Sequence, residues 1–534
     1  MKKVLLGIFS FFLITNAIAQ SFTDSNLPIV VINTNSQIIV DDPKIFCDMG
    51  IIWNGTGNRN YLTDPFNNYN GKIAIEIRGS TSQQYPKKSY GVETQDALGN
   101  KLNVPLLGMP TEHDWILYGA YPDKSLMRNE ITYSLFSKMQ PYSPRYVYCE
   151  LVINGQYMGV YTLLEKIKRD ANRVDISRLD SNDVAGDSLT GGYIIKVDKV
   201  TGSSTTTWTS PYQAKVKFLY HDPEDIELQP QQLNYIKNYV TNFENTVYGP
   251  NFTNLTTGFR AYADAWSFID FFIMQELGRT VDGYRSSSFM YKDKDSKGGK
   301  LTCGPMWDFN LSYGNADYCD AFDTTGWQYN FANVCPTFTT EPPDWWARIL
   351  QDSNYTHDLK CRWMGLRMTI LNTDSVNAWI DSVALYLNES QQRNFQRWPI
   401  LGTYVNWNYF IGNTYQEEID YLKWWFQSRS EWLDNNLPGN CWNFSVAEYE
   451  SGKENVKIFP NPFNNSATFS FSFNENSEKI LLIYDVIGKE VKRIITPKGE
   501  NSTTINKNEM DEGMYFYQLI DGNKTIATGK LIVE

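Results

Sequence analysis

The sequence predicts an α+β protein in which a large mixed body is followed by a small all-β sandwich. Helical periodicity and strand alternation succeed one another through most of the 534 residues, which is typical of a mixed helix and sheet domain. Between residues 456 and 534 the helical periodicity stops, and short strand patterns alternate with turns. Short strands at this spacing are typical of a sandwich.

The chain begins with a pattern typical of a secretory signal peptide. Lys2 and Lys3 form a basic start, an apolar run covers residues 4–14, and small residues at 17–19 precede Gln20. A basic, apolar and small-residue succession is what signal peptidases cleave. We therefore expect residues 1–19 to be removed during export. The remaining sequence shows no other run suited to crossing a bilayer.

The charge balance argues against a nucleic-acid-binding protein. The formal net charge is −12, whereas phosphate backbones are bound by basic patches. An acidic body suits divalent cations, and it also suits simple solubility. Aromatic residues make up 15% of the chain, which fits either a large core or a surface that stacks on sugars.

The cysteine pattern argues against a zinc site and in favour of disulfides. The spacing lacks the C-x-x-C pairs typical of zinc ligands. In an oxidising exterior some of the 7 cysteines are expected to pair, and their odd number leaves at least one thiol unpaired. Candidate pairs are Cys319 with Cys335 and Cys361 with Cys441, although the sequence alone does not assign them.

Two strand patterns near the start of the body enclose a polar loop. Residues 72–78 and 88–94 alternate as strands, and the loop at 79–86 carries small hydroxyl side chains. Backbone amides in such a loop can hold an anion, and Lys87 or Lys88 could neutralise it. An ordinary basic hairpin is the alternative.

A helix and a hairpin follow. Residues 123–138 predict a helix that starts at an Asp123 cap and carries Glu130. The Asn-Gly pair at 154–155 predicts a hairpin between two strand patterns, because this dipeptide favours the tight turn that strands need. Glu165 lies at the end of the second strand pattern, where it is either a site residue or a surface charge.

The central stretch of the body predicts two neighbouring carboxylates. Residues 260–277 predict a helix ended by Gly278, and residues 287–306 predict a hairpin. Asp282 precedes the hairpin and Asp308 follows it. An antiparallel hairpin returns the chain to its base, so the two carboxylates are expected to lie close together. The alternative is that both cap turns or pair with surface lysines.

Five groups of motifs occur in order between residues 28 and 437. They are RGSTS at 78–82 with PKKSY at 86–90, DKSLMRN at 123–129, GVYTLLE at 159–165, DGY at 282–284 with FMY at 289–291, and GPMWDFN at 304–310. Together they resemble the CotH kinase family of atypical, secreted kinase-like proteins. The resemblance implies that residues 20–437 form a two-lobed, protein-kinase-like domain.

The resemblance also implies site residues and cofactors. ATP with Mg²⁺ or Mn²⁺ would be bound, since phosphoryl transfer depends on positioned cations. Asp308 would bind the metal with Asn310 beside it, and Asp282 would orient the acceptor hydroxyl. Arg78 and Lys88 would bind phosphates; between Lys87 and Lys88 the choice stays open.

Two further roles and one departure come with this resemblance. Glu130 would pair with the phosphate-binding lysine, and Glu165 would lie at the hinge next to the adenine edge. Ser287 stands five residues after Asp282, where family members often have an asparagine. Serine is a weaker neutral metal ligand, which bears on turnover rather than on the fold.

The C-terminal segment resembles the sorting domain of the type IX secretion system. The motifs are FPNPF at 459–463, GMY at 513–515 and GKLIV at 529–533. The resemblance implies passage through the outer membrane to the cell surface, with the type IX secretion machinery as partner. Residues 438–455 would form the linker to this domain at 456–534. An adhesive sandwich module is the alternative.

Three functions are consistent with these residues. The first is a secreted kinase that phosphorylates Ser or Thr on exported or surface proteins. The second is a catalytically silent CotH fold used as a surface binding or assembly module, associated with polysaccharide degradation. The third, a glycosidase using Asp282 and Asp308 as its carboxylate pair, ranks last because the sequence shows no aromatic-lined groove.

Overall fold

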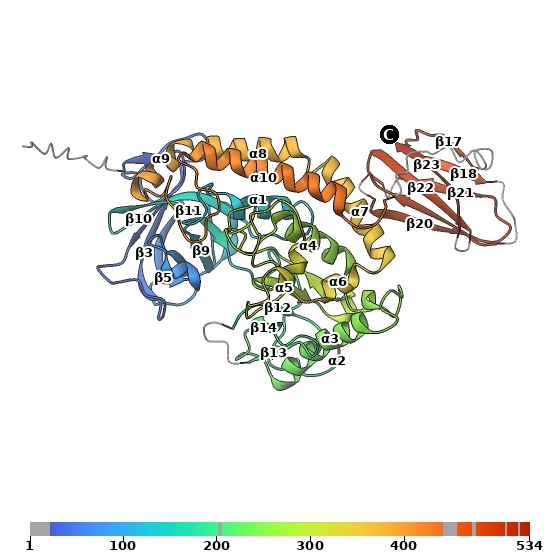
Figure 1. Ribbon diagram of the computed structural model, residues 1–534, viewed down its shortest axis with the longest axis horizontal. Coiled ribbons are helices and arrows are strands. Elements are labelled where there is room, and N and C mark those ends of the chain that lie inside the picture. Colours follow the sequence, from blue (N-terminus) through green and yellow to red (C-terminus); the bar gives the residue numbers. More distant parts are fainter. Residues whose placement is uncertain are drawn as a thin grey trace, which may run out of the picture.

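The computed structural model describes residues 22–200, 206–441, 456–471, 477–486, 488–507, 510–521 and 524–534 (Figure 1). The predicted signal peptide lies outside the described residues, and so does most of the predicted linker. Helices and strands are mixed up to residue 441, and only strands follow from residue 456. The α+β class and the all-β C-terminal region are therefore as predicted.

Seven strands of the body close into a barrel in the order β10-β11-β9-β6-β5-β3-β2. The neighbours are antiparallel except β10 and β2, which run parallel. Closure leaves no exposed sheet edge. Alternating apolar side chains fill the interior, with Trp115 only 1% exposed. The strands are β2 (Ile29–Asn33), β3 (Ile45–Ile52), β5 (Tyr69–Arg78), β6 (Ser89–Gln95), β9 (Asp114–Tyr118), β10 (Tyr146–Ile153) and β11 (Gln156–Glu165).

Both predicted hairpins of this region are confirmed, because β5 pairs with β6 and β10 pairs with β11. Two short two-stranded sheets are separate from the barrel. They are β1 (Asp24–Ser25) with β4 (Asn60–Tyr61), and β7 (Val104–Leu106) with β8 (Met109–Glu112).

A second sheet of the body has the order β13-β14-β12-β15-β16. The predicted central hairpin is β15 paired with β16, in which Met290 faces Cys303. This sheet places the end of β12 directly beside the start of β15, with Val197 opposite Ser288. Its strands are β12 (Tyr193–Val197), β13 (Thr207–Thr209), β14 (Lys217–Asp222), β15 (Ser288–Lys292) and β16 (Thr302–Cys303).

Helices surround a large aromatic core in the rest of the body. Helix α4 is buried from Ser267 to Gly278, and α8 and α10 run side by side along one edge of the body (Figure 1). None of the helices in the described residues is long and apolar enough to span a membrane. The longer helices are α1 (Arg128–Phe136), α3 (Pro230–Tyr248), α4 (Ala265–Gly278), α7 (Ser353–Met368), α8 (Thr373–Tyr386), α9 (Asn388–Arg397) and α10 (Tyr415–Asn436). Short helical turns are α2 (Gly186–Leu189), α5 (Phe331–Val334), α6 (Trp345–Ile349), η1 (Thr81–Gln84), η2 (Phe259–Ala261), η3 (Asp295–Lys297) and η4 (Gln328–Asn330).

The predicted boundaries of two helices were wrong. Helix α4 starts at Ala265 because the Asp264 carboxylate caps it by accepting the Trp266 amide, and it continues through Gly278 to a left-handed Arg279. Helix α1 starts only at Arg128. The Asp123 carboxylate instead accepts hydrogen bonds from the Ser125 and Arg128 backbones, which fixes the turn that precedes the helix.

Both candidate disulfides are formed. Cys319 joins Cys335 across 16 residues. Cys361 on α7 joins Cys441, which follows α10, across 80 residues. The other three cysteines lie in the described residues as buried free thiols: Cys47, Cys149 and Cys303.

Two sheets form the C-terminal region, with the orders β17-β18-β21 and β20-β19-β22-β23. They share one core, in which the Phe469 and Tyr517 rings meet edge to face at 5.0 Å between centroids. This is the predicted sandwich packing; strand β21 was not predicted. The strands are β17 (Val456–Phe459), β18 (Ser466–Phe471), β19 (Lys479–Tyr484), β20 (Glu490–Thr496), β21 (Ser502–Asn506), β22 (Gly513–Asp521) and β23 (Lys524–Val533).

Candidate functional site

The backbone that carries Asp282 and Asp308 is held in an uncommon conformation. Arg279, Tyr284, Ser287 and Asp308 are all left-handed, with φ of 40°, 65°, 49° and 66°. Such residues cost free energy, and in proteins they cluster at functional sites. The Phe309 amide donates to the Asn129 side chain on α1 at 2.6 Å, so the turn after β16 is fixed to that helix.

Asp308 lies near enough to Asp282 and to a third carboxylate, Asp198, for their charges to act on it. Burial, together with the charges of Asp282 and Asp198, raises the pKa of the half-buried Asp308 carboxyl to about 6. The positive charges of Arg78 and Lys199 act in the opposite direction. Asp308 therefore lies within electrostatic reach of two other carboxylates, one of which is the predicted Asp282, and of two cations.

Asp282 is oriented by its own loop. Its Oδ1 accepts a hydrogen bond from Arg285 Nη2 at 2.6 Å, while 30% of the aspartate side chain stays exposed. The Arg285 guanidinium is buried against the rings of Phe331 and Phe338, at 4.4 and 4.8 Å from their centroids. Asp282 is therefore fixed in position yet open to solvent on one side.

Asp198 was not among the predicted site residues. It follows β12, and the pairing of β12 with β15 carries it to the loop that contains Asp282. Its Oδ2 accepts a hydrogen bond from Lys196 Nζ at 2.9 Å. A Lys-x-Asp pair at the end of a strand was the available signal, but only the sheet order shows which loop it faces.

Arg78 supplies a cation without a fixed partner. It ends β5 and is half-buried, with its guanidinium carbon 5.8 Å from the centroid of the Trp307 ring. Burial lowers the pKa of Arg78, and the Asp308 charge opposes that change. Its guanidinium donates no hydrogen bond to any residue that the structure describes. A half-buried, unpaired guanidinium is suited to an anion.

Two lysines add positive charge near Arg78. Burial is the main cause that lowers the pKa of His221 to about 3, and the charges of Lys196, Lys166 and Arg78 act in the same direction. The imidazole is therefore neutral at physiological pH, and its Nε2 lies 2.9 Å from the Ile167 carbonyl oxygen. His221 thus acts as an uncharged neighbour of a basic group of side chains.

The predicted pair between Glu130 and a lysine is not formed. Glu130 is buried, its Oε1 accepts the Thr162 hydroxyl at 2.8 Å, and its Oε2 has no hydrogen-bond partner in the described structure. Burial, opposed by the Thr162 hydrogen bond, raises the pKa of Glu130 to about 8. This carboxyl is therefore mostly protonated at neutral pH, which is the state in which a lone buried acid costs least.

Both candidate lysines are bound by oxygen atoms of the protein itself. Lys88 Nζ donates to the Gln83 carbonyl at 2.6 Å and so closes the loop between β5 and β6. Lys87 is buried, and its Nζ donates to the Val160 carbonyl at 2.6 Å and to Asn394 Oδ1 at 2.9 Å. Burial lowers the pKa of Lys87 to about 7. Neither ammonium group reaches Glu130.

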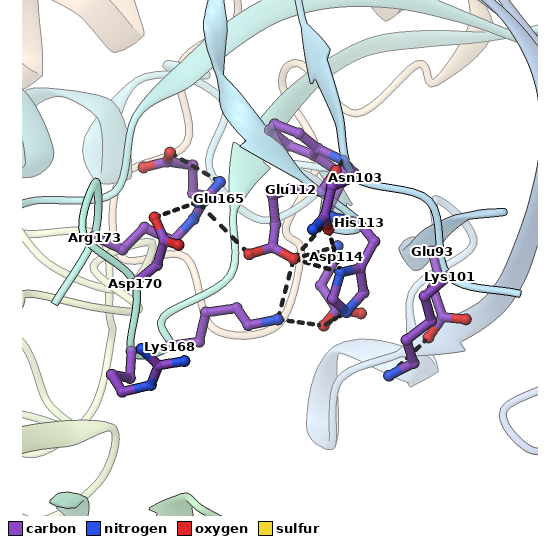
Figure 2. A network of polar contacts seen from close by, with 12 residues as sticks. Glu93, Lys101, Asn103, Glu112, His113, Asp114, Glu165, Lys168, Asp170 and Arg173 are labelled. Atoms are coloured by element: carbon purple, nitrogen blue, oxygen red, sulfur yellow. Dashed lines mark hydrogen bonds and ion pairs between the residues drawn. The ribbon is translucent and has the colours of Figure 1, made fainter. Parts of the chain in front are cut away.

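Glu165 belongs to a separate network of ion pairs. It is fully buried and pairs with Arg145 at 3.0 Å and Arg173 at 3.2 Å. Figure 2 shows Glu165 and Arg173 next to Glu112, which Arg173 also reaches. The carboxylate has its partners already, so its side chain is not free to recognise an adenine.

The same network contains a cluster with the composition of a metal site. Oxygen and nitrogen atoms of Glu112, His113 and Asp114 lie within 4.8 Å of one another. Lys168 Nζ lies 3.1 Å from Glu112 and 3.0 Å from Asp114, as Figure 2 shows. This lysine already supplies the positive charge that a metal would bring.

Asn310 lies two residues beyond Asp308 and is half-buried. Its backbone carbonyl accepts a hydrogen bond from Asn315 Nδ2 at 2.7 Å. Its side-chain amide makes no hydrogen bond to any described residue. Arg78 and Asp282 therefore act on Asp308, and Asn310 follows it two residues later. Lys88, Glu130 and Glu165 make other contacts.

Comparison with known sequence families covers both parts of the chain. Residues 75–433 match the profile described as CotH kinase protein. The chain belongs to the CotH kinase protein family. In addition to this CotH region, residues 457–534 match the profile described as secretion system C-terminal sorting domain. That domain implies secretion of the CotH protein to the cell surface or outer membrane.

Two other comparisons add little. A comparison with curated protein sequences found no match. Among solved structures, dimeric latent PorU from Porphyromonas gingivalis is 23% identical over 15% of this CotH-family chain, and the match covers 9% of the PorU chain with a TM-score of 0.14. A likeness of this extent carries no structural argument.

Proposed function

We propose that this CotH-family chain is a secreted phosphotransferase that moves the γ-phosphate of ATP to a Ser or Thr hydroxyl of exported or surface proteins. The observation that carries the proposal is the electrostatic coupling of Asp308 to Asp282, Asp198 and Arg78, whose guanidinium has no hydrogen-bond partner among the described residues. Phosphoryl transfer needs this combination of oxygen ligands for a cation and positive charge for phosphate.

The donor set fits a divalent cation. Carboxylate oxygens are the ligands that Mg²⁺ and Mn²⁺ prefer, and Asp308 with Asp198 would hold the ion, with Asn310 beside them. When bound, the ion would neutralise charge on the phosphates. A cation would also remove the repulsion between the three carboxylates that now raises the pKa of Asp308.

The residues of the chain divide the remaining work. Asp282, fixed by Arg285 and open to solvent, would orient the acceptor hydroxyl and take its proton as the oxygen bonds to the γ-phosphorus. The bond from that phosphorus to the bridging oxygen breaks, and ADP leaves. Arg78 would neutralise phosphate oxygens during transfer. In the proposed kinase-like body the barrel would serve as the small lobe, and α4 with the β15–β16 hairpin would belong to the large lobe.

Export would use both ends of the chain. We propose that residues 1–19 direct the first step, that the body extends over residues 20–437, and that residues 438–455 link it to the sorting domain at 456–534. The type IX secretion machinery would then be the partner of the C-terminal sandwich. ATP and a protein substrate would be the partners of the body.

A second candidate is a catalytically silent CotH fold that serves as a surface binding module, associated with polysaccharide degradation. The observation that favours it is the missing pair between Glu130 and a lysine, because Lys87 and Lys88 are both bound elsewhere. Ser287 in place of the family's asparagine points in the same direction.

Transfer of labelled phosphate from ATP separates these candidates. The secreted chain is incubated with exported proteins and Mg²⁺ or Mn²⁺, in parallel with Asp308→Asn and with the surface control Asp420→Asn. Labelling by the wild type and the control, but not by Asp308→Asn, supports the kinase. If the chain binds ATP with metal yet labels nothing, the silent module is the better description.

A further inference from the structure

A cavity of about 290 Å³ opens between the loop that joins β5 to β6 and the segment at residues 400–407. The loop is the same one that starts at Arg78. The second segment follows α9 and pairs with the chain after Asp308, where Ala316 bridges to Asn408. Two pieces of chain that lead to the carboxylate cluster therefore also form this cavity.

Aromatic rings form much of the cavity wall. Tyr85 and Tyr121 lie with their ring centroids 5.4 Å apart, and Tyr404 and Trp407 line the cavity from the other segment. The Tyr85 hydroxyl donates to the Asn406 carbonyl, which ties the two segments together. Tyr404 is 48% exposed, so part of its ring is open to a ligand.

Uncharged polar side chains fill the spaces between the rings. They belong to Thr81, Gln84, Thr403 and Asn406. None of these four side chains forms a hydrogen bond with a residue that the structure describes. None of the residues lining the cavity, all within the described part of the chain, carries a charge. The cavity thus offers flat apolar faces together with several unpaired neutral donors and acceptors.

Aromatic contacts connect the cavity to the loop of Asp282. The ring of Trp407 lies 5.8 Å from that of Tyr318. Burial raises the pKa of the Tyr318 hydroxyl, and Asp282 and Tyr85 act in the same direction. The Tyr318 ring stacks on Phe338 at 5.9 Å between centroids. Phe338 in turn faces the Arg285 guanidinium that binds Asp282, so packed side chains link the cavity to Asp282.

We propose that this cavity is a saccharide subsite that holds one ring of an uncharged glycan near the loop that carries Asp282. A sugar ring presents apolar C–H faces that stack on aromatic rings and hydroxyls that pair with amides and hydroxyls, which is the combination found here. The size is that of a small ligand site. The proposal concerns binding, and it holds whether or not the body transfers phosphate.

The two other ligand classes fit less well. An aromatic peptide side chain would stack on the same rings, but it would leave most of the four polar side chains desolvated and unpaired, which costs free energy. An acidic sugar would need a cation, and the lining supplies none. A neutral sugar would stack on the aromatic rings and pair with the four polar side chains.

Affinity electrophoresis in native gels tests the subsite. The mature chain is run through gels containing hydroxyethyl cellulose, galactomannan or dextran, beside Tyr404→Ala and a matched control, Tyr61→Ala. Tyr61 is 47% exposed on β4, against 48% for Tyr404. We expect retardation of the wild type by at least one of these polymers and about tenfold weaker retention of Tyr404→Ala. Tyr61→Ala and Tyr404→Phe, which keeps the ring, should behave as the wild type.

Several outcomes would overturn the proposal. They are migration unaffected by all three polymers, equal retention of Tyr404→Ala and the wild type, and a peptide that binds with the same dependence on Tyr404. Asp308→Asn keeps the subsite separate from the reaction, because it should retain glycan binding while it loses phosphate transfer. Absence of phosphate transfer by the wild type, with glycan binding intact, would count against the kinase and leave the subsite standing.

Discussion

Replacing Asp308 by asparagine should stabilise the free protein while removing its response to ATP and metal. The carboxyl has an ordinary pKa of 3.8 and a pKa of about 6 in the folded chain. At about 1.4 kcal/mol for each unit of pKa difference, the ionised Asp308 lowers the free energy of unfolding by about 3 kcal/mol. Because the group is half-buried and screened on one side, 3 kcal/mol is an upper value. Asparagine also suits the left-handed backbone here better than alanine does.

The sign of the effect follows from proton binding. Between pH 3.8 and about 6 the folded state holds a proton on Asp308 that the unfolded state releases, so the free energy of unfolding falls as pH rises through this window. Above it the full cost of the buried charge is present. The advantage of Asp308→Asn should therefore be absent near pH 3.5, grow through this range, and stay constant above it.

Calorimetric unfolding from pH 3.5 to 8 in a chelating buffer measures this difference, with Asp420→Asn as an exposed control. A second series adds ATP with Mg²⁺, which should raise the Tm of the wild type and the control but not that of Asp308→Asn. A variant less stable than the wild type at pH 7.5 without ligand would refute the electrostatic reasoning. If the Tm of the variant still rises with ATP and metal, Asp308 is not part of the binding site.

Three further changes probe other parts of the body. Thermal scans should show the Tm of Glu130→Gln rising increasingly above that of the wild type from pH 4.5 to about 8. The reason is that the Glu130 carboxyl of the folded wild type retains a proton over that range, whereas the unfolded chain releases it. A gain confined to lower pH would contradict this. Arg78→Gln should weaken ATP binding in titration calorimetry and raise the pKa of Asp308 further, so unchanged affinity would exclude Arg78 from the phosphate site. Replacing both Cys361 and Cys441 by serine should cost about 4.5 kcal/mol in urea unfolding, since closing a loop of 80 residues restricts the unfolded chain by about that amount; a loss no larger than that of the shorter disulfide would contradict the loop argument.

Local patterns predicted the hairpins, and long-range pairing decided what they became. The Asn-Gly turn and the strand alternation identified β10 and β11 correctly. Closure of the barrel could not be predicted from the sequence, because it depends on a parallel pairing between β2 and β10 that joins residues more than a hundred positions apart. Parallel pairs of distant strands leave no mark in local periodicity.

For the candidate site, too, local patterns predicted one part of the arrangement and missed the contacts between distant elements. The return of a hairpin to its base was enough to expect Asp282 near Asp308. The partners of Glu130 and Lys87 were not predictable, because they depend on which element covers the barrel. Helix α9, which the sequence patterns did not reveal, supplies the Asn394 oxygen that holds Lys87. Asp198 was missed for the related reason that sheet order, not sequence order, places it.

The disulfide between Cys361 and Cys441 determines how mechanical load travels through the protein. It lies where the body ends, so a pull arriving from the sorting domain reaches Cys441 first. The force then crosses the sulfur atoms to α7 and bypasses α8, α9 and α10, which lie inside the covalent loop. A molecule held at a surface by its C-terminal end would therefore transmit drag or stretching to the body without peeling off its outer helices.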